Sequence, residues 1–236
     1  MPFRIRQSVS SCKDCSYRKL RLFCNLSDEA LERFDRMGVP VTFPTQTVIF
    51  EEDNKVANVF VVCSGHLKLS ATSREGRTMI LRLAGPGDVL GLSAALSGEN
   101  HEVTAETIEP TQLKSISRVD FLSLFESFSE VGQKAAKVAA LEYRAVYLDA
   151  RRLAISGSAA AKLAQLLLDW AGNAAIEQHS PRFTMALTHE ELASMCGISR
   201  ETVTRLLNQF ERDALIERRG STMVLRDVTA LDRITV

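Results

Sequence analysis

Residues 188–213 read THEELASMCGISRETVTRLLNQFERD and predict two short helices joined by a tight turn. Thr188 and Glu191 have the spacing of a capping box, which starts a helix. Gly197 suits a tight turn, and Ser199 can cap a second helix over residues 200–213. The buried face of that helix would be Val203, Leu206, Leu207 and Phe210. Two capped helices around a glycine turn are the plan of a helix-turn-helix.

The exposed face of the second predicted helix carries side chains that can read DNA bases. Arginine can bind guanine through two hydrogen bonds, and glutamate can accept one from the cytosine amino group. Residues 217–225 predict a β-hairpin wing whose arginines could contact phosphate. The candidate DNA-binding residues are Ser199, Arg200, Glu201, Thr202, Thr204, Arg205, Arg218 and Arg219. The alternative is a solvated helix stabilised by pairing of Glu201 with Arg205.

The rest of the chain divides into three further parts. Residues 1–26 form a basic arm that carries cysteines, and residues 27–117 contain short β-rich runs separated by glycine turns, which is typical of a sandwich or barrel. Residues 118–156 are helical and precede the helix-turn-helix part, residues 157–236. After Ser129 apolar residues recur with a spacing of three or four: Val131, Val138, Leu141, Ala145, Leu148 and Ile155. This seam predicts pairing with a second copy, and packing against its own domain is the alternative.

Composition limits the classes of function without selecting one. The 236 residues include 29 Lys plus Arg and 29 Asp plus Glu, so DNA binding has to be argued from the position of the charges. No run of about 18 apolar residues is present, and the N-terminus lacks a signal core. We therefore expect a cytoplasmic protein without a membrane partner. The four histidines are scattered along the chain, so we expect no catalytic residues and no enzyme.

Three motifs together resemble the CRP/FNR transcription regulators over nearly the whole chain. They are SGHLK at 64–68, GPGDVLG at 85–91 and ISRETVTRLL at 198–207. The resemblance implies an α+β fold: an N-terminal β-roll like the cyclic-nucleotide-binding jelly roll, a long dimerisation helix and a C-terminal winged helix-turn-helix. It also implies a homodimer, with double-stranded DNA and RNA polymerase as partners.

The same resemblance implies a particular DNA sequence. In CRP-like members, the residues at the positions of Arg200, Glu201 and Arg205 read a TGTGA-type half-site, whereas FNR-like members differ at the position of Arg200. We therefore expect a palindromic site with TGTGA-like half-sites about 34 Å apart.

The resemblance does not extend to the residues that hold a cyclic nucleotide. CRP-like binders place Gly-Glu and Arg-Ser after the Gly-Asp turn, but here Leu-Ser follows Gly91 and His-Glu occupies positions 101–102. A buried phosphate needs a cation or oriented amides, and Lys114 is the only basic residue within 84–116 apart from His101. Cyclic AMP is therefore disfavoured. Haem is disfavoured too, because the carbon monoxide sensors of this family need Cys and His where Gly91 and Ser93 stand.

The cysteines offer a candidate metal site. Cys12 and Cys15 have CxxC spacing, Cys24 follows, and nearby basic residues would favour thiolates. The set resembles the arm of FNR-type oxygen sensors, which hold a [4Fe–4S] cluster through four cysteines. The fourth FNR ligand falls at Lys114 here, so the fourth ligand stays unknown. Cys63 is a weak candidate that fits a buried strand residue better.

Several interpretations of the cysteine arm remain open. Besides a cluster, the cysteines could form a thiol–disulfide switch or a zinc site, or be idle while the β-roll binds an organic ligand. The main hypothesis is a redox- or oxygen-responsive regulator in which loss or oxidation of the arm's metal repacks the long helix. A different class, a metal- or ligand-binding module acting through protein contacts, is the second alternative. Cys196 is expected to be structural.

Overall fold

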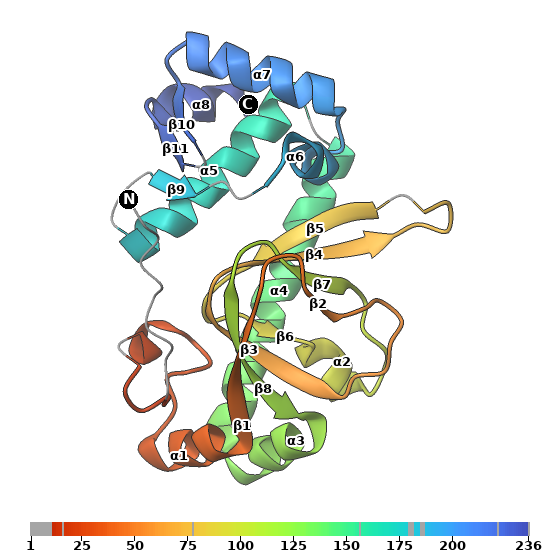
Figure 1. Cartoon of the computed structure of the whole chain (residues 1–236), viewed down its shortest axis with the longest axis vertical. Helices are drawn as coiled ribbons and strands as arrows, with labels where there is room; N and C mark the ends of the chain where they lie inside the picture. Colours follow the sequence, from red (N-terminus) through yellow and green to blue (C-terminus); the bar gives the residue numbers. More distant parts are fainter. Residues whose placement is uncertain are drawn as a thin grey trace. The chain divides into compact units, whose positions relative to one another are not determined.

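The chain folds into two compact units, Met1–Ala145 and Val146–Val236 (Figure 1). This computed structural model describes residues 11–15, 17–76, 78–155, 157–178, 182–184, 187–220 and 222–235. The first ten residues of the predicted arm and His179 lie outside the described residues. No helix among the described residues is long and apolar enough to cross a membrane.

The first unit contains two four-stranded antiparallel sheets, ordered β1-β8-β3-β6 and β2-β7-β4-β5. The strands are β1 Gly38–Phe43, β2 Val48–Phe50, β3 Asn58–Ser64, β4 Leu67–Thr72, β5 Thr78–Ala84, β6 Val89–Leu90, β7 Thr104–Thr107 and β8 Thr111–Ser117. A buried apolar cluster drawn from both sheets includes Phe60, Leu67 and Leu113. Burial of such side chains is the main driving force for the assembly. The predicted β-roll is confirmed.

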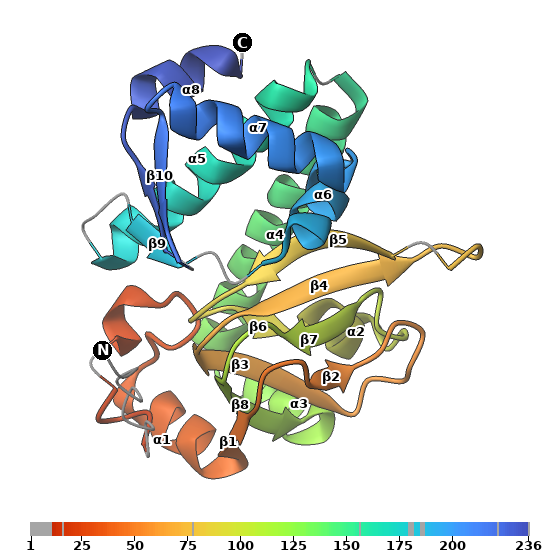
Figure 2. The ribbon, with the colours of Figure 1, turned by 45° about the horizontal axis from the view of Figure 1, so that its top comes forward.

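The first unit also contains helical elements, which lie beside the β-roll (Figure 2). They are the 3-10 turn Arg18–Leu20, α1 Asp28–Met37, α2 Leu92–Ser97, α3 Arg118–Ser127 and α4 Ser129–Ile155, which runs past the division between the units. Phe23 of the arm stacks on Phe121 of α3 with ring centroids 5.9 Å apart. Phe23 of the arm is therefore part of the apolar core of the first unit.

The predicted helical region after residue 118 is two helices, since the chain leaves the helical conformation at Phe128. Val131 is fully buried in the core of the first unit. It therefore packs within its own domain, and the prediction that places it in the dimer seam is wrong. Further along α4, Leu141 is 53% exposed.

The second unit contains the winged helix. Its elements are α5 Ala159–Gln178, β9 Arg182–Thr184, α6 His189–Cys196, α7 Arg200–Arg212, β10 Ile216–Arg219, β11 Thr222–Leu225 and α8 Val228–Ile234. The strands form one antiparallel sheet in the order β10-β11-β9. The predicted wing is thus confirmed, and β9 and α8 are elements that the sequence pattern did not reveal.

Candidate functional site

Helix α6 begins at the capping box that the sequence predicts. The Glu191 N–H donates to the Thr188 hydroxyl at 3.2 Å, and the Thr188 N–H donates to the Glu191 carboxylate at 2.9 Å. Gly197 ends the helix with φ of 63°, a left-handed conformation that glycine adopts without a Cβ clash. The left-handed conformation of Gly197 therefore sets the direction in which the chain enters the next helix.

Helix α7 is capped and amphipathic as predicted. The Thr202 N–H donates to the Ser199 hydroxyl at 3.2 Å. The apolar face is at most 4% exposed and consists of Val203, Leu206, Leu207 and Phe210. Because that face is buried, the opposite face of the helix is turned to solvent.

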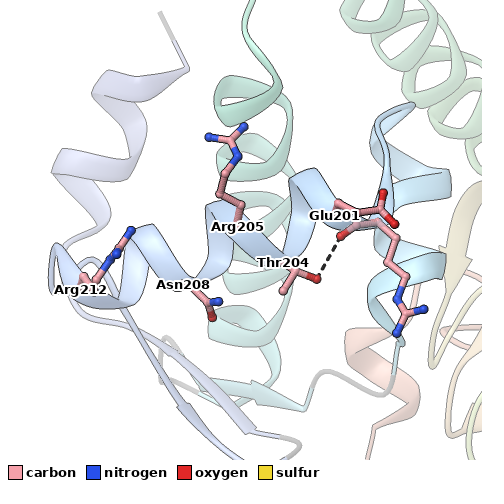
Figure 3. Close-up of a pocket in the computed structure, with 6 residues that line it drawn as sticks. Glu201, Thr204, Arg205, Asn208 and Arg212 are labelled. Carbon is pink, nitrogen blue, oxygen red and sulfur yellow. Dashed lines mark hydrogen bonds between the residues drawn. The ribbon is translucent and has the colours of Figure 1, made fainter.

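The outward face of α7 forms an open hollow lined by six polar side chains (Figure 3). They are Arg200, Glu201, Thr204, Arg205, Asn208 and Arg212. Sequence reasoning missed Asn208 and Arg212. They continue the three- and four-residue spacing from Arg205 that puts helical residues on one face, so this signal could have found them.

The charged side chains that line this hollow face solvent. Arg200, Glu201 and Arg205 are all exposed. The carboxylate of Glu201 is bonded by its own backbone N–H and by the Ser199 hydroxyl, and these contacts lower its pKa. Glu201 therefore stays ionised and can accept hydrogen bonds from a base.

The three predicted hydroxyl contacts are used within the protein. The Thr204 hydroxyl lies 2.8 Å from Nδ1 of His189 and donates to the Arg200 carbonyl at 3.0 Å. The hydroxyls of Ser199 and Thr202 lie 3.0 Å apart at the helix cap. These groups position the start of α7, and the charged side chains are the stronger candidates for base contacts.

The wing arginines are also engaged. Arg218 donates to the Glu211 carboxylate at 2.6 Å and to the Asn208 side-chain carbonyl at 2.7 Å, which ties the wing to α7. Arg219 pairs with Glu217. Contact of both arginines with phosphate stays a prediction, and the bonds of Arg218 also fix the angle of the wing on α7.

The cysteine arm is anchored by Asp35 of α1. The Ser11 hydroxyl donates to Asp35 at 2.8 Å, and the Cys12 N–H donates at 3.0 Å. The ammonium of Lys114, 2% exposed, lies 3.2 Å from the same carboxylate and donates to the Gly38 carbonyl at 3.0 Å. Burial raises the pKa of Asp35, but hydrogen bonds from Cys12, Ser11 and Lys114 outweigh it and hold the pKa at about 2.

The structure gathers four of the five cysteines in one region. Burial raises the pKa of Cys12, Cys24 and Cys63, that of Cys24 to about 11. Cys63 further raises the pKa of Cys12 and Cys24, and Cys15 raises that of Cys24 and Cys63. Cys12 and Cys24 both pack against the apolar core of the first unit.

Cys63 lies on β3, as predicted, but is only half-buried. Cys196 is buried in the second unit, which confirms its structural role. Among the described residues, no three thiol, imidazole or carboxylate groups are placed to hold a single metal ion.

The interior of the β-roll is occupied by ring packing. His101 is 4% exposed and stacks on Phe50 with ring centroids 3.9 Å apart. Arg82 of β5 lies just before residues 84–116, which contain no arginine. Its guanidinium is 3.4 Å from the Asp88 carboxylate and 3.3 Å from the Glu142 carboxylate of α4. This arginine is thus committed to two carboxylates.

Comparison with known proteins agrees with this architecture. A family model described as the Crp-like helix-turn-helix domain matches residues 161–234, and the cyclic nucleotide-binding domain matches residues 40–128. The structure titled FixK2 from Bradyrhizobium japonicum superposes with a TM-score of 0.76 at 23% identity, covering 84% of this chain and 98% of that one.

Two relatives are similar over most of their length. A probable transcriptional regulator flp of Lacticaseibacillus casei is 32% identical, covering 84% of this chain and 88% of the relative. A cyclic AMP receptor protein of Thermus thermophilus is 28% identical, covering 88% and 91%. The fold and the outward face of α7 define a DNA-binding regulator of the winged-helix class. The chain belongs to the CRP/FNR family of transcription regulators.

Proposed function

We propose that this regulator binds, as a homodimer, a palindromic DNA site with TGTGA-like half-sites and responds to redox conditions through its cysteine arm. The observation that carries the DNA half of the proposal is the exposed group Arg200, Glu201 and Arg205 on one face of a capped helix. A single guanidinium can donate two hydrogen bonds to guanine, and an ionised carboxylate can accept one from cytosine. RNA polymerase is the expected partner at the promoter.

Pairing through α4 is supported by apolar side chains that nothing in the chain covers among the described residues. The exposed ones are Leu141, Tyr143, Val146 and Tyr147. Large apolar side chains grouped on one exposed helix stretch mark an interaction surface. A two-fold axis along α4 gives two copies of α7, which match the two halves of a palindrome.

The redox half of the proposal rests on Cys12, Cys15 and Cys24. Burial raises the pKa of Cys12 and Cys24, and the positive charge of Lys114 opposes it at both thiols, as does Arg21 at Cys24. This donor set fits a [4Fe–4S] cluster, which when bound would supply sensitivity to oxidation. A zinc site and a thiol–disulfide switch remain the alternatives for this arm.

A β-roll ligand is the second candidate, because one relative is named for cyclic AMP. Two contacts weigh against a nucleotide. The ring of His101 rests on Phe50, and Arg82 is held by two carboxylates that a phosphate would have to displace. Titration with cyclic AMP should therefore leave DNA affinity unchanged.

The DNA proposal is tested by measuring the affinity for a labelled palindromic duplex with TGTGA half-sites and for a scrambled duplex. Arg200→Ala should lose about 1–3 kcal/mol of binding free energy on the palindrome alone. Arg74→Ala, an exposed arginine of the first unit, is the matched control. If Arg200→Ala binds each duplex as tightly as the unchanged protein does, base reading is refuted. A module that acts through protein contacts is then favoured.

A further inference from the structure

We propose that His189 contacts a DNA phosphate in its protonated form, so that each copy of the protein takes up a proton when it binds DNA. This inference rests on the DNA half of the proposed function and adds one residue to the proposed contacts. Affinity for DNA then depends on pH in the range where a histidine gains its charge.

His189 lies beside the hollow on the outward face of α7. It is the first residue of α6, directly after the capping residue Thr188, and it is half-buried. Its Nδ1 lies 2.8 Å from the hydroxyl of Thr204, which lines the hollow. In a helix-turn-helix the first helix crosses the phosphate backbone while the second reads the base edges. A side chain at the start of the first helix that touches the second helix is therefore well placed for a phosphate.

Two hydrogen bonds fix which nitrogen of the neutral His189 ring carries the hydrogen. A hydroxyl has a single hydrogen, and the Thr204 hydroxyl donates it to the Arg200 carbonyl, 3.0 Å away (Figure 3). The Thr204 oxygen therefore accepts from His189, and Nδ1 is the N–H of the ring. A neutral imidazole has one N–H, whereas the charged ring has two. Nε2 can consequently donate to a phosphate oxygen only when His189 is protonated.

The surroundings of His189 keep the ring neutral in the free protein. Burial lowers its pKa, and the charges of Arg218 on the wing and of Arg200 on α7 lower it further. A nearby phosphate has the opposite effect, because its negative charge favours the charged ring. On binding DNA, Nε2 therefore takes a proton from solvent, while the hydrogen bond from Nδ1 to Thr204 is kept.

The difference between the free and bound states sets the sign of the pH dependence. The DNA-bound protein holds the proton of His189 more tightly, so affinity rises as the pH falls toward the pKa of the free protein. Glu201 does not add to this slope, because its lowered pKa keeps it ionised over the range. A shift of one pKa unit changes an equilibrium constant about tenfold. Affinity should thus rise about tenfold for each copy of His189 between about pH 8 and about pH 5.5.

The test measures the affinity of the full-length protein for the labelled palindrome and for the scrambled duplex from about pH 8 to about pH 5.5. His189→Asn keeps an amide N–H close to the place of Nδ1 but gains no charge, and it should lose the slope. His189→Lys is charged over the whole range, so it should bind more tightly than His189→Asn with an equally flat profile. His66→Gln, on a partly exposed histidine of the first unit, is the matched control and should keep the slope.

The slope should be the same on both duplexes, since phosphate contacts carry no sequence information. A His189→Asn protein that keeps both the far-UV circular dichroism and the pH slope of the unchanged protein would overturn the inference. So would a folded His189→Lys protein that binds no more tightly than His189→Asn. If the unchanged protein shows the slope but binds both duplexes equally, the palindrome is wrong and the phosphate contact of His189 stands.

A second measurement counts the protons directly. Calorimetric titration with the palindrome at about pH 6.5, in two buffers that differ in their heat of protonation, gives the number of protons taken up on binding. The unchanged protein should take up more protons than His189→Asn, by up to about one for each copy. Equal uptake by the two proteins would overturn the inference, because the proton would then go to another group.

The dependence on salt separates a phosphate contact from a purely structural role. At about pH 5.5, the plot of log affinity against log salt concentration should be less steep for His189→Asn, by about one for each copy. A folded His189→Asn protein that binds more weakly with an unchanged salt slope would show that His189 only supports α7.

Discussion

The recognition helix α7 and the cysteine arm are built in opposite ways. The cap of α7 joins Ser199 to a residue three positions on, and its buried side chains repeat every three or four residues. The arm is held by partners far along the chain: Ser11 and Cys12 bond to Asp35, 24 and 23 residues away, and Lys134 donates to the Asn25 carbonyl from 109 residues away.

This difference separates a surface shaped by neighbours in sequence from an arm whose position depends on distant groups. A helix held by neighbours in sequence keeps its shape whenever its own unit is folded. The arm keeps its position only while several distant groups stay in place, so changes at its thiols can propagate to α1, β8 and α4. The following predictions measure how far the two regions differ.

The largest effect should come from the core under α7. Phe210→Ala removes a side chain that is 2% exposed and should cost about 3–5 kcal/mol of unfolding free energy. Urea unfolding can be followed by the fluorescence of Trp170, the single tryptophan, which lies on α5 of the same unit. Arg205→Ala, on the exposed face, should unfold like the unchanged protein. A cost below about 1 kcal/mol for Phe210→Ala would contradict the packing described for α7.

The next effect should come from the anchor of the arm. Lys114→Met removes a buried cation from Asp35 and should cost about 3 kcal/mol in the first unit. Maleimide should then label Cys12 faster, because the arm loses its attachment. Lys13→Met is the matched control, since its pair with Glu32 is about half exposed and solvent screening should leave it with a much smaller effect.

Equal unfolding free energies for the two lysine variants would mean that the arm does not depend on its distant anchor. The double variant with Asp35→Asn sharpens the result. Because the two groups contact each other, their separate costs should not add.

The same contrast explains what could be predicted from sequence. The start of α7 and its buried face were predictable because the cap and the apolar spacing lie within a dozen residues. The cysteine site was predictable only in part. Lys114 stood out as the place of a missing ligand, and nothing nearby in sequence indicates that its ammonium reaches Asp35.

Two departures from the predictions have the same origin. Cys63 lies on a strand as predicted but is only half-buried, because a bulge, which is defined by pairing with β8 about fifty residues away, interrupts the strand there. Val131 fits the seam of α4 by spacing, yet it is buried against its own unit. Periodicity indicates that a face is apolar and does not indicate what covers it.

A smaller effect should separate two serine caps. Ser199→Ala removes a purely local cap and should cost about 1 kcal/mol, with a matching loss of DNA affinity. Ser27 caps α1, and its hydroxyl also donates to the carboxylate of Glu130, 103 residues away. Ser27→Ala should therefore cost more in its own unit. Equal costs in urea unfolding would show that the distant contact adds nothing to the cap.

The smallest effect should be a dependence on pH in the long-range region. Burial lowers the pKa of His101 below its ordinary value of about 6.5, and its backbone bonds to Asp53 and Asn54, which hold it in place. The folded state therefore binds the proton less readily than the unfolded chain. Stability is full above about pH 6.5 and falls as the pH drops toward the lowered pKa. His101→Gln should lose this slope in urea midpoints measured from pH 7.5 to about 5, whereas His66→Gln, on a partly exposed histidine, should keep it. If His101→Gln keeps the slope, another group of the first unit titrates over this pH range. The dependence on pH would then not come from His101.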